Sequence, residues 1–269
     1  MRDRIIFIIA TVAVLAAPAM AIMVANPTSE TPYERFGMAV EYTNEKWKVR
    51  YPSAGLNITS QRILAKPSLG VLRYLDLYGY LGVTDMNIPQ SGFNGSGEMA
   101  FGLGSRLHYA VFYPNLGCNT CSFPIRWYAA ATWLTTKTSG TRPIGSSGWQ
   151  DITFRFQTID LSLYGSWEFG RIKPYVGVHW TYITGRRYID YYNSTNPDPY
   201  ASGSNLFSDP SQYPKPLLGL DIDVGKGYVI SLEATYFGKD ETSISVGISQ
   251  LYVSKKHEDD QGPAMEHPK

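Results

Sequence analysis

The chain has 269 residues, of which 43% are hydrophobic and 17% charged, and its formal net charge at pH 7 is +1. The hydrophobic fraction excludes a disordered chain, and the charged fraction lies below the roughly 25% of a typical soluble domain. The balanced charge gives no electrostatic basis for binding nucleic acid, so no such partner is expected.

The first 21 residues have the pattern of a secretory signal peptide. Two arginines give a positively charged start, an apolar run follows, and Ala19-Met20-Ala21 is a cleavage pattern of small residues. We therefore expect residues 1–21 to be removed and residues 22–32 to form a linker. An uncleaved membrane anchor is the alternative, because the apolar stretch continues to Val24.

Beyond residue 32, apolar side chains alternate with small or polar ones at the period of two that is typical of β-strands. Ten strands are expected, at residues 33–50, 58–68, 74–85, 98–113, 126–138, 151–169, 173–190, 215–225, 227–237 and 242–253. Phe154 and Phe156 have the opposite parity to Ile159 and Leu161, which predicts a β-bulge near residues 157–158.

The connections between these strands differ in length and composition. Residues 86–97, 139–149 and 191–214 are polar, rich in turn-forming residues, and expected to be long loops. Residues 170–172 and 225–227 are expected to be tight turns. The charged segment 254–269 predicts a disordered periplasmic tail.

The composition of the two strand faces decides which face is expected to meet water. The faces opposite the apolar ones carry Gly, Ala, Ser, Thr and Tyr with few charges, which is typical of a narrow, filled lumen. We therefore expect residues 33–253 to form a single all-β domain. Its expected fold is an antiparallel up-and-down transmembrane β-barrel of about ten strands, with eight strands as the alternative. A soluble β-barrel or sandwich is the alternative.

Three stretches carry a resemblance to a known family: residues 74–82 (YLDLYGYLG), 101–107 (FGLGSRL) and 174–178 (PYVGV). Together with the signal peptide, they resemble the small outer-membrane β-barrel family of the OmpA, OmpX and OmpW type. The sequence departs from that family in its ten expected strands, where eight are usual, and in the 17 residues, Val253–Lys269, that follow Tyr252.

The resemblance implies a protein of the Gram-negative cell envelope, located in the outer membrane after secretion. The partners that it implies are outer-membrane lipid, including lipopolysaccharide, and the outer-membrane assembly machinery. A monomer is expected.

Ionisable residues of the lumen-facing parity are the candidate functional residues. They are Glu41, Asp76, Arg106, His108, Asp160, Glu168, His179, Asp221, Asp223 and Glu233. They could form a proton or cation path, a catalytic site, or a structural polar network that fills a narrow barrel, and we expect the network. No cofactor is expected.

Two of the histidines are candidates for catalysis, and three of the acids are candidates for binding a cation. His108 and His179 lie within strands and have no catalytic signature around them, so we nominate no catalytic residue. Asp221, Asp223 and Glu233 could hold a cation, but no loop of suitable ligand spacing accompanies them, so no metal is expected.

Cys118 and Cys121 lie in the connection after the fourth expected strand. No His follows Cys121, which excludes the c-type haem pattern, and one Cys pair lacks the ligands of a structural zinc site. A local disulfide is expected in a secreted protein, with a redox role as the alternative.

These features predict a non-enzymatic outer-membrane barrel that has a structural or surface-interaction role, or that allows limited passage of small solutes. One alternative is a barrel enzyme that acts on lipid or peptide at the extracellular rim. The other is a soluble periplasmic barrel that binds an apolar ligand.

Overall fold

The computed structural model describes residues 31, 35–51, 54–112, 125–145, 148–193, 196–208, 213–236 and 241–252. The predicted signal peptide, the C-terminal tail and the loop with Cys118 and Cys121 lie outside these residues. In the described part of the chain, no helix has the length and apolar character needed to cross a membrane.

The described residues form eleven β-strands and one short 3-10 turn. The strands are β1 (Phe36–Tyr51), β2 (Ala54–Leu72), β3 (Leu75–Ile88), β4 (Phe93–Phe112), β5 (Ile125–Ile144), β6 (Gly148–Trp167), β7 (Ile172–Asn193), β8 (Asn196–Ser208), β9 (Lys215–Gly225), β10 (Tyr228–Tyr236) and β11 (Thr242–Tyr252), with η2 (Pro89–Ser91) between β3 and β4.

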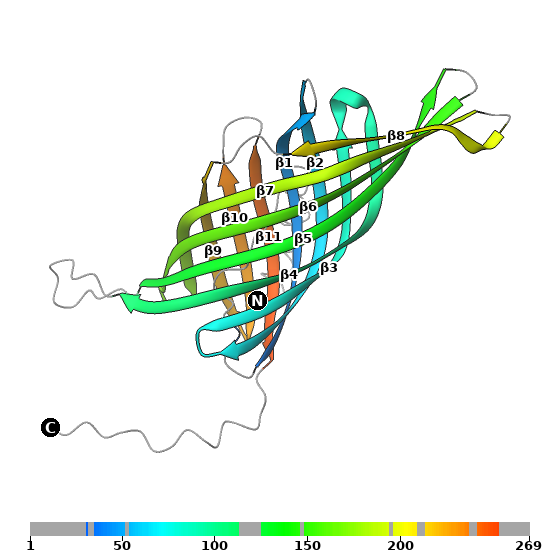
Figure 1. Cartoon of the computed structure of the whole chain (residues 1–269). Helices are drawn as coiled ribbons and strands as arrows, with labels where there is room; N and C mark the ends of the chain where they lie inside the picture. Colours follow the sequence, from blue (N-terminus) through cyan, green and yellow to red (C-terminus); the bar gives the residue numbers. More distant parts are fainter. Residues whose placement is uncertain are drawn as a thin grey trace, which may run out of the picture.

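All neighbouring strands pair antiparallel, and the pairing of β1 with β11 closes the sheet into a barrel (Figure 1). The strand β7 has two partners on one side, because β9 pairs with its residues 172–179 and β8 with its residues 184–193. Around the end where β1 begins and β11 ends, which we call the lower end, ten of the described strands form the ring. The expected antiparallel barrel of about ten strands is confirmed.

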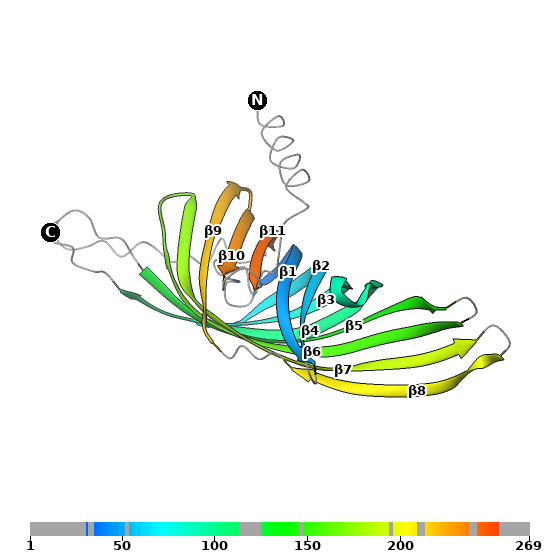
Figure 2. The same cartoon turned by 90° about the horizontal axis from the view of Figure 1, so that it is seen from above.

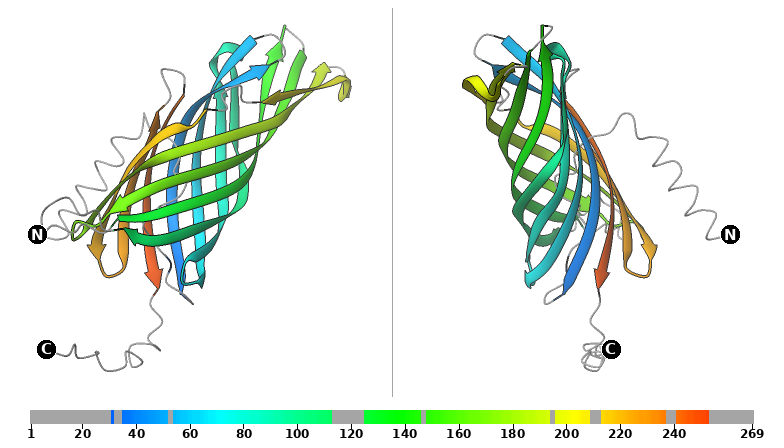
Figure 3. Two further views of the ribbon diagram at one scale, coloured as in Figure 1. Left: turned by 60° about the vertical axis from the view of Figure 1, so that its left-hand side comes forward. Right: turned by 90° about the vertical axis from the view of Figure 1, so that its right-hand side faces the viewer.

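Toward the opposite, upper end, β8 takes the place of β9–β11. It crosses from the tip of β7 to the upper end of β1, where Ser208 lies opposite Arg50. Figure 2 shows β5–β8 extending far to one side of the ring, and Figure 3 shows how strongly these strands are tilted. The upper part of the molecule is therefore built mainly from β1–β8.

The strands β2–β7 are longer than the sequence predicts, and three expected loops are wrong. Residues 86–97 and 139–149 are mostly the paired ends of β3–β4 and β5–β6, and residues 191–214 contain β8. Their polar composition suggested loops. In the barrel, however, each polar segment pairs with a neighbouring strand above the apolar part of the wall, so its backbone groups are satisfied by the sheet.

The outer face of the barrel carries a band of large apolar side chains. Leu103 and Met99 are 67% and 65% exposed, and outward Leu, Val, Ile, Tyr and Trp side chains continue around β1–β7 and β9–β11. The charged residues Glu41 and Asp76 are, by contrast, completely buried in the interior. This distribution of apolar and charged side chains is the reverse of that in a soluble barrel.

The expected bulge in β6 is wrong, because β6 pairs with β5 and β7 in unbroken register. The change at residues 157–158 is an inversion of the pattern instead. Below it, Ile159 and Leu161 point outward, whereas above it Phe154 and Phe156 point inward and are buried. The outward positions above it are polar, among them Arg155. The strand thus keeps its side-chain alternation while its surroundings change along its length.

Above this level the interior contains an apolar cluster. Its buried members are Trp47, Val49, Ile58, Met86, Ile88, Phe93, Ile152, Phe154, Phe156, Ile183, Ile189 and Phe207, which come from seven strands. Trp47 contacts Phe156, and Phe154 contacts both Phe93 and Phe207, in edge-to-face geometry. The lumen is therefore polar in its lower part and apolar in its upper part, which corrects the expectation of a polar lumen throughout.

Candidate functional site: the barrel interior

At the lower end of the lumen, polar contacts gather around the buried carboxylate of Asp76 on β3. Its Oδ2 accepts hydrogen bonds from Nε and Nη2 of Arg106 on β4, at 3.1 and 2.5 Å. Its Oδ1 lies 3.7 Å from Nε2 of His108. The backbone N–H of Thr31 donates to Oδ2 at 3.5 Å, so a residue that precedes β1 also reaches this carboxylate.

A second buried pair joins β1 and β2. Nζ of Lys66 lies 3.3 Å from Oε1 of Glu41 and 4.5 Å from the centre of the Tyr78 ring. The Tyr78 hydroxyl is 3.0 Å from Oγ1 of Thr132 on β5. A charge that is buried with both a counter-ion and an aromatic face avoids much of the cost of losing water.

Tyrosine rings fill the space on the side of β5–β7. The rings of Tyr128 and Tyr164 stack with centres 4.9 Å apart, and Tyr164 lies 5.9 Å from Tyr175. The Tyr175 hydroxyl donates a hydrogen bond to Oε2 of Glu233 on β10 at 3.3 Å. The three rings come from neighbouring strands and are buried, so side chains occupy the lower lumen on this side.

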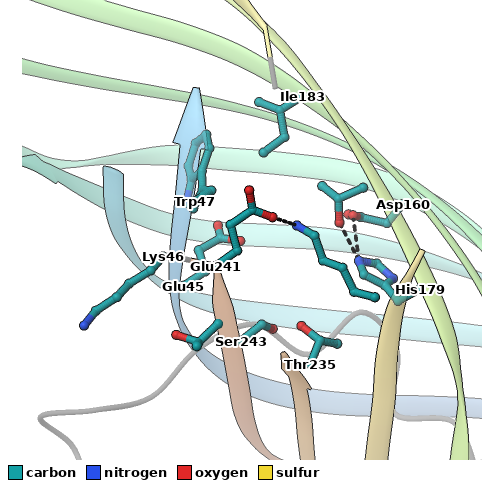
Figure 4. A pocket seen from close by; sticks show the side chains of 12 residues that line it. Glu45, Lys46, Trp47, Asp160, His179, Ile183, Thr235, Glu241 and Ser243 are labelled. Atoms are coloured by element: carbon teal, nitrogen blue, oxygen red, sulfur yellow. Dashed lines mark hydrogen bonds and ion pairs between the residues drawn. The ribbon is translucent and has the colours of Figure 1, made fainter. Parts of the chain in front are cut away.

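A small cavity lies between this polar region and the apolar cluster (Figure 4). His179 of β7 lies 3.3 Å from Asp160 of β6, and Nζ of Lys215 lies 3.1 Å from Oε2 of Glu241. Glu45 contributes to the lining and pairs with Arg62. The cavity measures about 20 Å³, which holds on the order of one water molecule.

The arrangement around His179 differs from that of a catalytic triad. Its Nε2 contacts both Asp160 Oδ1 and, at 2.5 Å, Thr181 Oγ1. A triad needs the acid on one ring nitrogen and the nucleophile on the other. Nδ1 of His179 is buried and makes no hydrogen bond within the described residues. The contacts and the small volume suit a structural polar cluster better than a substrate site.

The structure places eight of the ten predicted lumen residues in the interior or at its lower opening. These are Glu41, Asp76, Arg106, His108, Asp160, His179, Asp221 and Glu233. The other two lie at the lower rim. Glu168 follows the end of β6 and pairs there with Arg126 and Lys173 at 3.5 and 3.3 Å. The exposed Asp223 accepts a hydrogen bond from the backbone N–H of Gly225 in the β9–β10 turn. Both residues lie beside a turn, so their side chains are at the rim and not in the lumen.

Five buried charged residues were missed by the sequence reasoning. They are Glu45, Arg62, Lys66, Lys215 and Glu241. Glu45 could have been found, because it lies four residues after Glu41 on the same face of one strand. Arg62 and Lys66 lie on β2, whose weak apolar alternation did not identify the inward face. Of the three missed cations, Lys66 pairs with the predicted Glu41, whereas Arg62 and Lys215 pair with the missed acids Glu45 and Glu241.

The described residues show no group of three His, Cys, Asp or Glu side chains that could hold a metal ion. Asp221 lies inside the barrel on β9, Asp223 is exposed at the turn, and Glu233 lies on β10. The sequence pattern Asp-x-Asp therefore does not bring these three carboxylates together.

No family model and no curated protein sequence matches the chain. Solved structures with some similarity include the translocator domain of the autotransporter NalP from Neisseria meningitidis, with a TM-score of 0.43 and 9% identity over 82% of this chain and 88% of that one. An outer membrane channel from Pseudomonas putida F1 has a TM-score of 0.39 and 8% identity, over 86% of this chain and 100% of that one.

The transport unit of the autotransporter AIDA-I from Escherichia coli has a TM-score of 0.35 and 9% identity, over 87% of this chain and 93% of that one. Membership of the OmpA, OmpX and OmpW type of family stays a prediction.

Proposed function

We propose that this chain is an integral outer-membrane barrel protein with a closed lumen, which serves a structural or surface-interaction role. The observation that carries the proposal is the direction of the side chains. Large apolar residues such as Leu103 point away from the barrel, while Asp76 and Glu41 are completely buried inside it. An outer apolar band suits hydrocarbon, and a closed ring leaves no unpaired edge in the membrane.

The proposed orientation follows from the unequal length of the barrel at its two ends. At the upper end β5–β8 extend far beyond the ring (Figure 1) and stay paired in one sheet. Long extensions are typical of the extracellular side of such barrels, so we place the lower end in the periplasm and β5–β8 at the cell surface. The surrounding lipid, the outer-membrane assembly machinery and the monomeric state expected from the sequence belong to this proposal.

The filled interior favours a structural role over that of a channel. Tyrosine rings and ion pairs occupy the lower lumen, and the apolar cluster around Phe154 and Trp47 occupies the upper lumen. Water and ions would need to pass both regions. Catalysis is not part of the proposal, because the His179 contacts lack the order of a triad.

The upper parts of β5–β8 provide the surface for contacts. Residues 198–204 are exposed along β8, and Tyr200 and Leu206 are large apolar side chains open to solvent there. A paired hairpin presented above a membrane suits recognition by other molecules at the cell surface.

Reconstitution of the mature protein in a planar lipid bilayer tests the closed lumen. We expect insertion without a steady ion current, with a general porin measured under the same conditions as the conducting control. Correct folding is checked separately by migration in unheated and heated detergent gels, where a folded membrane barrel changes its position on heating. A steady current from correctly folded protein would contradict the closed lumen.

A further inference from the structure

Three cations lie side by side on the outer face of β5, β6 and β7. Lys137 lies opposite Arg155 in the register of β5 and β6, and Arg155 lies opposite Arg186 in the register of β6 and β7. Residues that oppose each other across antiparallel strands share a face, with Cβ atoms about 5 Å apart. We call these three residues the cationic row.

Like charges placed directly opposite each other destabilise a sheet, so the cationic row needs nearby groups that offset the repulsion between its charges. Lys137 pairs with one such group, Glu98 of β4, whose Oε2 lies 2.7 Å from Nζ. The Arg155 guanidinium lies 5.5 Å from the centre of the Tyr188 ring. Arg186 makes no ion pair within the described residues. Three positive charges thus share one carboxylate.

The position of the row relative to the apolar band identifies the kind of anion that fits. Four residues below the row, the same strands carry Trp133, Ile159 and Tyr182, which are paired in register on the same outer face. Four residues span about 13 Å along a strand, and strand tilt reduces this to on the order of 10 Å along the membrane normal. The cations therefore lie just above the apolar band.

The residues further out set an upper boundary. Four residues above the row on the same face, Asp151 of β6 lies opposite Asp190 of β7. These carboxylates would repel an anion, so an anionic ligand of the row lies between them and the apolar band. In the proposed orientation this is the level of the headgroups of the outer leaflet.

We propose that the cationic row binds a phosphate group of an outer-leaflet lipid headgroup, as in a phosphorylated glycolipid. The inference rests on the proposed membrane location and adds a specific ligand chemistry to it. Guanidinium groups match phosphate oxygens with paired hydrogen bonds, and two neighbouring arginines can hold one phosphate between them. The contact of the Arg155 guanidinium with the Tyr188 ring helps to position it for such a bond.

The test uses refolded full-length mature protein in detergent micelles, titrated against fluorescently labelled lipopolysaccharide. The variant carries Arg155→Gln and Arg186→Gln, both at exposed positions. The control carries Arg73→Gln and Arg171→Gln, which remove the same charge from exposed turns at the lower end. We expect at least a tenfold loss of affinity in the variant and little change in the control.

Two further measurements identify the ligand group. Enzymatic removal of the lipid phosphates should weaken binding to the native protein to the level of the variant. Inorganic phosphate at millimolar concentration should compete poorly, because it lacks the acyl chains that contact the apolar band. Effective competition by inorganic phosphate would overturn the assignment to a lipid.

Equal affinity of the row variant and the control variant for the phosphorylated lipid would overturn the proposed site. The heat-dependent gel shift is recorded for both variants, and an unchanged shift shows that both fold. A protein that fails to fold in detergent or lipid would contradict the proposed membrane location, and this outcome is distinct from loss of phosphate binding alone.

Discussion

At the scale of single residues, the register of the strands creates the ion pairs of the lumen. Asp76 and Arg106 lie directly opposite each other on β3 and β4. Asp160 pairs in register with Thr181, two residues beyond His179, so the contact of Asp160 with His179 is diagonal. Both kinds of neighbour are within side-chain reach across a sheet.

Substitution of Asp76 tests whether these buried pairs stabilise the barrel. Asp76→Asn leaves the buried Arg106 guanidinium without its counter-charge, and breaking a buried pair in this way costs about 3–5 kcal/mol. We expect a corresponding loss in the free energy of unfolding, measured with urea on protein folded in lipid vesicles.

The control for this substitution is Asp223→Asn at the exposed lower rim. It removes the same charge, but the group is solvated, so a change of less than about 1 kcal/mol is expected. Equal losses in the two variants would show that the buried pair contributes nothing specific.

Two inward glycines make room for the tyrosines of the lumen. A Cβ added at Gly104 would lie 2.1 Å from Cε2 of Tyr78, and one at Gly219 would lie 1.9 Å from Cζ of Tyr175. Both distances are far below van der Waals contact. The small residues on the inner face thus have a packing reason, which agrees with the filled lumen expected from composition.

At the scale of the element, β6 passes through two environments without a change of register. Its lower outward positions, such as Leu161, are apolar, whereas the outward Gln157 and Arg155 above them are polar. In the proposed membrane location, the outer face meets water where the lipid ends, and the inner face then needs apolar packing. A boundary between lipid and water at this level would explain the inversion of the pattern.

A lysine scan along the outer face of β6 tests this boundary. Leu161→Lys places a charge in the apolar band, which costs about 2–4 kcal/mol near the middle of a bilayer. Gln157→Lys introduces the same side chain four residues higher, where the cost is about 0–1 kcal/mol. We expect the first variant alone to unfold at clearly lower urea concentration, and similar midpoints would contradict the proposed boundary.

The sequence predicted the strand faces well where a strand lies in the apolar band. Alternation placed Glu41, Asp160 and Glu233 on the inner face, and the structure buries all three. The prediction from alternation failed above the band. There the inward Phe154 and Phe156 produce the same pattern as a β-bulge, and the polar composition of β8 is that of a loop. Local pattern cannot show that a polar segment pairs with a distant strand end.

At the scale of the whole molecule, the barrel combines two kinds of interior. The lower part, closed by ten of the described strands, holds charges and tyrosines inside an apolar wall. The upper part, built mainly from β1–β8, has an apolar interior and a polar exterior, as in a soluble protein. Such a molecule would be anchored in lipid below and would present a polar surface above.

Tryptophan quenching by brominated acyl chains tests this account most directly. Two variants each keep a single tryptophan, and phenylalanine replaces the other tryptophans. One variant keeps Trp180, which is 37% exposed on the outer wall, and the other keeps Trp47, which is 2% exposed in the apolar cluster. In vesicles of brominated lipid, the Trp180 variant should lose most of its fluorescence and the Trp47 variant should keep most of it. Quenching of Trp47 as strong as that of Trp180, or none of Trp180, would contradict an apolar wall that faces lipid.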